Sequence, residues 1–218
     1  MRLLVVNAGS SSLKLSVVEA DDSLSAEREL GRPGDPDTRA GLREFVAAAS
    51  DVTAVAHRLV HGGPDVLEAM VVDDAVRARL DEGARIDPLH VPPALAILDE
   101  LRSTLGVSQV VCVDTAFHAA LPDAARTYAI PAAWRELGVR RYGFHGLSFA
   151  WALTQAAEQL HRQPQELQIV VAHLGSGASV CAIRDGHSVD TSMGFTPVEG
   201  LVMATRSGSV DPGALLWL

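Results

Sequence analysis

Cysteine is scarce in this chain, and long apolar segments and runs of positive charge are absent from it. The two cysteines, Cys112 and Cys181, each lie inside an apolar run, which favours buried, reduced thiols and a cytoplasmic protein. The sequence alone leaves a disulfide between them open. No apolar stretch approaches the ~20 residues that a membrane-spanning helix needs. Residues 3–6 are too few for the apolar core of a signal peptide.

The charge balance excludes a large nucleic-acid interface. The formal net charge is -9, and no cluster of lysine and arginine supplies a basic face. A few local cations can still set the potential inside a cleft that binds a small anion. With 218 residues, 48% hydrophobic and 21% charged, the chain has the balance of an ordinary soluble globular protein of one large domain or two small ones.

Apolar periodicity predicts alternating strands and helices. The run 3–6, turn residues 7–12 and the alternation in 13–17 predict a β-hairpin at the start of the chain. The polar segment 20–38 is expected to be a surface loop. Further strands are expected at 52–60, 107–113, 167–173 and 180–183, and helices at 38–50, 73–80, 92–106, 131–138 and 148–161. Residues 214–218 look like an interrupted element; the alternative is a short terminal helix docked on its own core.

A short pattern occurs twice. Residues 5–12 and 171–178 both combine a strand, a polar residue and a Gly-Ser turn of small residues, and Gly9 aligns with Gly175 without gaps. Gly-Ser turns are common, so coincidence is the competing explanation. We interpret the pair as a sign of two duplicated domains.

The first hairpin loop is a candidate anion site. Its small residues let backbone N–H groups approach an anion closely, and the serines and Lys14 add donors and positive charge. A plain hairpin turn with an exposed lysine is an equally good interpretation. The segment 57–63 carries Arg58 from an apolar strand into a Gly-Gly turn. An arginine in such a strand needs a partner, and an anionic substrate fits better than a structural carboxylate.

Three more segments carry candidate side chains. Asp114 follows a buried strand, where ligand sites of open α/β sheets lie, although it could instead cap a helix. Residues 140–146 gather two arginines and a histidine around glycines and aromatics, and Arg206 lies on a Gly-containing loop. Such donors suit a phosphoryl-transfer site. The eight histidines show no zinc-ligand spacing, so magnesium is favoured if phosphates are handled.

Together these motifs resemble the acetate kinase family. The resemblance rests on residues 6–14, 57–63, 88–90, 114–118, 140–146, 173–177 and 190–208, in order along the chain. It implies an α/β fold of two duplicated ribonuclease H-like (actin-like ATPase) domains with mixed central sheets and a cleft between them. We expect a substrate and phosphate domain at 1–146 and the start of a nucleotide-binding domain, incomplete here, at 147–218.

The resemblance also implies reversible transfer of phosphate from ATP to acetate with Mg²⁺ or Mn²⁺, in a protein that is a homodimer at full length. Asp114, His145 and Arg206 would be catalytic, Arg58 would bind the acetate carboxylate, and Asn7 would hold the metal. Asp114 would organise metal or water rather than accept a proton. The implied substrate pocket comprises Val60, Leu89, His90, Phe144 and Pro197. The implied phosphate contacts are Ser10, Ser11, Ser12, Lys14, His173, Leu174, Gly175, Ser176 and Gly177.

The chain departs from the family pattern in a few places. Ser176 stands where the family usually has asparagine, residues 207–209 read Ser-Gly-Ser in place of Ser-Gly-Asp, and Val91 follows His90 where asparagine is common. Family members are also much longer. Propionate or butyrate kinase, or a non-catalytic anion-binding domain of the same fold, are the alternatives.

We expect the 218 residues alone to have little or no kinase activity, because the adenosine-binding segments and a second magnesium carboxylate of the family have no counterpart here. A coupled assay for acetyl phosphate measures this. Turnover close to that of an ordinary kinase would contradict the expectation.

Overall fold

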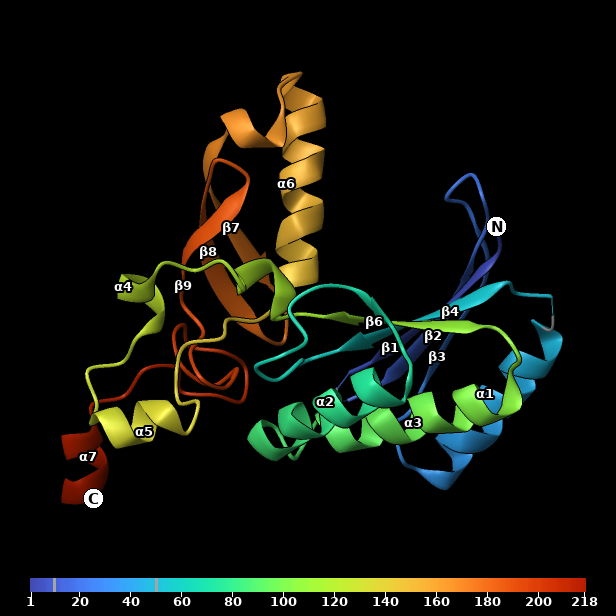
Figure 1. Cartoon of the computed structure of the whole chain (residues 1–218), viewed down its shortest axis with the longest axis horizontal. Helices are drawn as coiled ribbons and strands as arrows, with labels where there is room; N and C mark the ends of the chain where they lie inside the picture. The colour runs from blue at the N-terminus through green and yellow to red at the C-terminus, as the bar shows by residue number, and fades with distance from the viewer. Residues whose placement is uncertain (10, 50) are drawn as a thin grey trace. The chain divides into compact units, whose positions relative to one another are not determined.

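The computed structural model describes residues 1–9, 11–49 and 51–218, which form two compact units, Met1–Val113 and Asp114–Leu218 (Figure 1). The boundary expected at 146/147 falls inside the second unit, so the division into a substrate domain and a nucleotide domain stays a prediction. No helix among the described residues is long and apolar enough to cross a membrane.

The first unit is built on a mixed six-stranded sheet in the order β3-β2-β1-β4-β6-β5. β1 pairs antiparallel with β2 and parallel with β4, so it lies inside the sheet. Alternate side chains of β1 are buried, as expected for a strand with one well-covered face. The strands are β1 (Leu3–Ala8), β2 (Leu13–Val18), β3 (Leu24–Leu30), β4 (Ala54–Leu59), β5 (Met70–Val71) and β6 (Ser108–Val113).

Three helices lie along one side of this sheet: α1 (Pro36–Ala48), α2 (Asp74–Ile86) and α3 (Val91–Thr104) (Figure 1). Proline begins α1, and the Asp73 carboxylate caps α2 by accepting a hydrogen bond from the Val76 amide at 2.7 Å. The cap expected at Asp73 is therefore confirmed, and the helix that follows is longer than expected. Leu42, Leu80 and Leu98 are fully buried and anchor the three helices to the core.

The second unit pairs one long helix with an antiparallel sheet. α6 (Gly146–Leu160) packs on β7 (Gln168–Leu174), which pairs with β8 (Ala178–Arg184), which in turn pairs with β9 (His187–Thr191). The remaining elements are short: η1 (Ala116–His118), α4 (Asp123–Arg126), α5 (Ala132–Glu136), η2 (Pro164–Glu166) and α7 (Pro212–Trp217).

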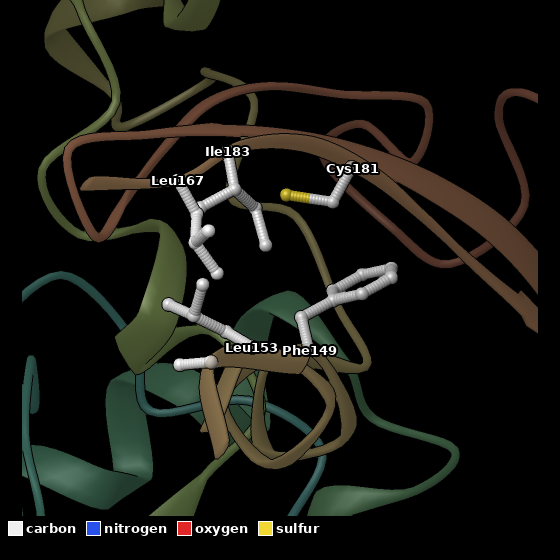
Figure 2. Close-up of a cluster of buried hydrophobic side chains, with 6 residues drawn as sticks. Phe149, Leu153, Leu167, Cys181 and Ile183 are labelled. Carbon is white, nitrogen blue, oxygen red and sulfur yellow. The ribbon is translucent and has the colours of Figure 1, made fainter. Parts of the chain in front are cut away.

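The core of the second unit forms where α6 meets the sheet. Phe149 and Leu153 point from the helix toward Leu167, Cys181 and Ile183 (Figure 2). Phe149 and Leu153 are four residues apart, which places them on one face of the helix. Both cysteines are free thiols, Cys181 buried and Cys112 half-buried, so no disulfide joins them.

Two sequence expectations were wrong. Residues 24–30, expected in a loop, form the edge strand β3, whose mostly exposed side chains lack the apolar alternation of a half-buried strand. Residues 187–191, outside the strands expected from the sequence, form β9, which is held by pairing with β8. α7 is helical, but Leu215, Leu216 and Trp217 are exposed, so it is not docked on a core among the described residues.

Both copies of the repeated sequence pattern form a β-hairpin. β1 and β2 form an antiparallel hairpin, as do β7 and β8. The aligned glycines close both turns: the Gly9 amide donates to the Ser12 carbonyl and the Gly175 amide to the Gly177 carbonyl, each at 2.9 Å. The two turns differ by one residue in length, so the hairpins share their strand pairing, and the interpretation that they are related by duplication stays a prediction.

Replacing Phe149 with alanine is expected to destabilise the second unit by about 3–5 kcal/mol, because a fully buried ring leaves a cavity. Trp151→Ala on the same helix is the matched control; Trp151 is 67% exposed, and the change should stay within about 0.5 kcal/mol. Urea unfolding measures both. Equal losses in the two variants would contradict the assigned core.

Candidate functional site

In the first unit, three polar side chains form a row across neighbouring strands. Asn7 on β1 is paired with Lys14 on β2 and with Arg58 on β4. Directly paired residues in a sheet point to the same face. The alternate residues of these strands, including Val6 and Leu59, are buried, so the row occupies the less covered face.

The row ends against the serine-containing hairpin. The Arg58 Nη1 donates to the carbonyl oxygen of Ala8, the last residue of β1, over 3.4 Å. The Arg58 guanidinium therefore lies beside the turn that Gly9 and Ser12 close. Lys14 Nζ is 3.8 Å from a Glu29 carboxylate oxygen, an exposed pair that holds the lysine only weakly.

The other residues expected to act in the first unit differ in how far they are exposed to solvent. Ser10 lies outside the described residues, and Ser11 is exposed in the loop. Val60 is buried directly after β4, and Leu89 is 80% exposed. His90 Nδ1 is 2.8 Å from a carboxylate oxygen of the buried Asp87, which fixes the ring. Burial alone would raise the pKa of Asp87, but its contacts with His90 outweigh burial, so this pKa is lowered from its ordinary value.

In the second unit, two histidine rings stack. The centroids of His145 and His173 are 4.0 Å apart, and their planes differ by 21°. His145 Nδ1 is 2.8 Å from the Ser179 hydroxyl, and His173 Nδ1 is 2.9 Å from the Ser148 hydroxyl. Both rings are thus held in orientation through one nitrogen, by serines that lie far from them in sequence.

Arg206 lies beside the same group. Its Nη1 donates to the Pro197 carbonyl at 2.8 Å. A Cβ added at Gly177 would be 3.3 Å from His145 Nε2 and 3.7 Å from Arg206 Nη1. Gly177 therefore closes the second hairpin loop directly against His145 and Arg206. The structure brings together three of the residues that the sequence singled out for phosphoryl transfer.

Asp114 and Phe144 are buried near the start of α6. Asp114 is 3% exposed, and its carbonyl accepts the Gly146 amide at 3.0 Å. The alternative role of Asp114 as a helix cap is not supported, since Thr115 takes the cap position of η1 without a side-chain hydrogen bond. Phe144 is 1% exposed and Pro197 is buried, whereas Leu174 and Ser176 are exposed in or beside the loop.

The two adjacent arginines 140 and 141 have structural partners. Arg141 forms a salt bridge with Glu199 at 2.9 Å and donates to the Met193 carbonyl at 3.0 Å. Tyr128 donates to the same Glu199 carboxylate. Arg140 stacks over the Tyr142 ring at 4.7 Å. Arg141 and Tyr128 therefore hold the segment that carries Pro197 in place through Glu199, and we call these three residues the Glu199 cluster. The contribution of Arg141 to the site is indirect.

Sequence reasoning missed the residues that support the site: Ser148, Ser179, Tyr128 and Glu199. Glu199 lies in the segment 190–208 that carries the resemblance, whereas the other three lie outside such segments. No local spacing reveals the role of any of them, because each contacts a partner at least 25 residues away. Only the Gly- and Ser-rich composition of 186–213 hinted that this segment wraps around other groups.

The described residues do not include a group of three or more histidine, cysteine, aspartate or glutamate side chains that could hold a metal ion by itself. Magnesium typically uses one or two protein oxygens together with substrate phosphates and water. The amide oxygen of Asn7 is of the right type for such a site. This donor therefore fits a metal ion that is also held by nucleotide phosphates and water.

Comparison with known proteins gives a consistent result. A profile described as the acetokinase family matches residues 41–218. Acetate kinase of Microcystis aeruginosa is 44% identical over 179 residues, which cover 82% of this chain and 45% of that protein. Acetate kinase of a Synechococcus species is 40% identical over 256 positions, covering 99% of this chain and 64% of that protein.

Two solved structures share the fold at high similarity. A propionate kinase from Francisella tularensis superposes with a TM-score of 0.89 at 30% identity, covering 99% of this chain and 63% of that one. Acetate kinase of Porphyromonas gingivalis gives 0.86 at 32% identity, with 100% and 63% covered. The chain spans less than two thirds of each of these relatives. The mixed α/β fold expected from the sequence is confirmed.

The ionisation of the Tyr128 hydroxyl tests the Glu199 cluster. Burial, followed by the hydrogen bond to Glu199, raises the pKa of Tyr128 to about 12. An unfolded tyrosine ionises near pH ~10, so the stability that Tyr128 contributes is complete below that pH and is lost as pH rises toward 12. Absorbance titration should show a tyrosinate step near pH 12 that Tyr128→Phe removes and Tyr142→Phe retains. A tyrosinate step near pH ~10 that is assigned to Tyr128 would contradict the buried contact between Tyr128 and Glu199.

Proposed function

Because the chain belongs to the acetokinase family, we propose that it supplies the acetate- and phosphate-binding groups of an enzyme that transfers phosphate reversibly between ATP and acetate. One observation carries the proposal: Lys14 on β2, Asn7 on β1 and Arg58 on β4 are aligned across the three strands, beside a turn of small residues. Their direct pairing across these strands supports a common role in binding anionic reactants and their metal ion.

The chemistry requires fixed positive charge more than a base. Acetate is ionised at neutral pH, because a carboxylic acid has a pKa of about 4–5. It is therefore already a nucleophile. The obstacle is repulsion between the carboxylate and the phosphoryl oxygens, which preorganised cations and N–H groups reduce.

Residues of the first unit would bind the two anions. Arg58 would pair with the acetate carboxylate, since a guanidinium offers a fork of donors that matches two oxygens. Lys14 and the serines of the hairpin loop would contact phosphate. On the first unit, the substrate methyl group would contact Val60, Leu89 and His90.

Residues of the second unit would stabilise charge on the transferring phosphoryl group. His145 and Arg206 lie together at the Gly177 loop, so their donors converge on one place. The loop 173–177 would contact phosphate of the nucleotide, as its likeness to the first hairpin suggests. Asp114 would orient a water or metal ligand rather than accept a proton, because acetate has no proton to lose.

Mg²⁺ or Mn²⁺ would neutralise phosphate charge in the reaction. Asn7 would hold it through the amide oxygen while nucleotide oxygens and water complete its coordination. A homodimer of the whole protein and a cytoplasmic location, which free Cys112 and Cys181 favour, belong to the same proposal.

Propionate is the nearest alternative substrate. The Francisella tularensis relative is a propionate kinase, and one methylene changes binding in an apolar pocket by only ~1–3 kcal/mol. Leu89, at 80% exposed, leaves room on that side of the first unit. Comparing the affinities of the chain for acetate, propionate and butyrate by calorimetry would decide between them. A non-catalytic domain would bind these anions without transferring phosphate.

Calorimetric titration of the chain with acetate, and with ADP and Mg²⁺, tests the proposal. Arg58→Ala should weaken acetate binding at least tenfold, because a charge-assisted hydrogen bond is worth about 1.5–3 kcal/mol. Arg28→Ala is the matched control, since Arg28 lies on the edge strand and pairs with the exposed Glu44. Acetate binding of equal strength in wild type and Arg58→Ala would refute the assigned role.

A further inference from the structure

Two hydrogen bonds fix the backbone on either side of His145. The Gly146 amide donates to the Asp114 carbonyl, and His118 Nε2 is 3.0 Å from the Phe144 carbonyl. Asp114 and His118 belong to the same short segment, so that segment holds both peptide groups that flank His145. His145 itself has a φ of 58°, in the left-handed region. A residue with a Cβ seldom adopts this conformation unless its surroundings impose it.

The proton of His118 can be placed from its partners. A carbonyl oxygen only accepts, so Nε2 must carry the hydrogen that it donates to Phe144. Nδ1 is then an acceptor, and it lies 2.8 Å from the hydroxyl of the fully buried Ser188. The Phe144 carbonyl, which can only accept, therefore selects the tautomer with the proton on Nε2, and Ser188 donates to Nδ1 and orients the ring from its other side. The Cys181 thiol lies 3.3 Å from the Ser188 oxygen and can donate to it in turn.

The surroundings keep His118 neutral and immobile. Its ring is 3% exposed and makes edge contacts with Phe117 and Phe149, each with centroids 5.7 Å apart. Burial lowers the pKa of His118 to about 4, so the neutral tautomer persists at physiological pH. A donor with one fixed hydrogen and one fixed orientation is suited to holding a single carbonyl.

The loop is shaped to reach this ring. Gly143 has a φ of 74°, and a Cβ there would be 2.6 Å from two ring atoms of His118. A Cβ at Gly146 would collide with the Asp114 carbonyl. The two glycines around residues 144 and 145 are therefore required by the close approach of the 114–118 segment, which ties the two motifs together physically.

We propose that His118 is a positioning residue: through its Nε2–H bond to the Phe144 carbonyl, and with its ring oriented by the Ser188 hydroxyl, it sets the left-handed backbone of His145 and hence the place of that imidazole beside His173 and Arg206. The inference deepens the proposed function, because it explains how a residue placed there in the reaction is held. His118 touches no reactant in this scheme and acts only through the loop.

Imidazole nitrogen spectra of the ¹⁵N-histidine-labelled chain, recorded near neutral pH, test the proposal. In the wild type, His118 should be the Nε2–H tautomer. Ser188→Ala removes the bond that orients the ring through Nδ1 and should shift the His145 resonances. His118→Ala should shift them as well, whereas His118→Gln should restore their wild-type positions, since its amide can donate to the Phe144 carbonyl. His187→Gln is the control, because His187 is exposed and its Nδ1 faces the Asp185 carbonyl instead.

Three outcomes would overturn the proposal: a wild-type His118 with its proton on Nδ1, unchanged His145 resonances in folded Ser188→Ala, or equal shifts in His118→Gln and His118→Ala. If His118→Ala fails to fold, Ser188→Ala and His118→Gln still decide. The spectra need neither acetate nor nucleotide. Failure of the calorimetric test would therefore refute the proposed reaction without touching this result, and the reverse also holds.

Discussion

The pairing register of β1 with its two neighbours is the constraint on which the first unit depends. β1 is antiparallel to β2 and parallel to β4, and that register places Lys14, Asn7 and Arg58 at one level. A slip of one residue on either side would turn a member of the row toward the buried face. Buried Leu4, Val6 and Leu59 oppose such a slip, because it would expose them. The apolar core of the sheet thereby fixes the polar row.

In the second unit, loops and element ends hold the candidate side chains in place. His145, His173 and Arg206 come from the start of α6, the end of β7 and a turn near α7, and each is held by a different partner. The salt bridge of Arg141 with Glu199 secures the segment that carries Pro197, whose carbonyl holds Arg206. Fixed donors of this kind need no reorganisation when charge develops on a bound group. Rigid loops are thus a physical requirement of the proposed chemistry.

The sequence predicted the features that depend on local patterns. The hairpin repeat, most of the helices, the Asp73 cap and the buried strands follow from apolar periodicity and turn residues. β3 was not predicted because an exposed edge strand has no apolar alternation. β9 was not predicted because its stability comes from pairing with β8. Ser179, Glu199 and Ser188 could not be found, since their partners lie far away in sequence. Arg141 was expected near phosphate because composition alone does not show that Glu199 neutralises it.

Backbone and arginine side-chain NMR spectra of the chain titrated with acetyl phosphate give the most direct test of the aligned row. Acetyl phosphate combines the carboxyl-derived group and the phosphate for which the row is proposed to provide donors. The account predicts that the amides of residues 9 and 11–12 and the Arg58 side-chain N–H shift together along one binding curve. Shifts confined to other parts of the chain, with these groups unchanged at saturation, would contradict it.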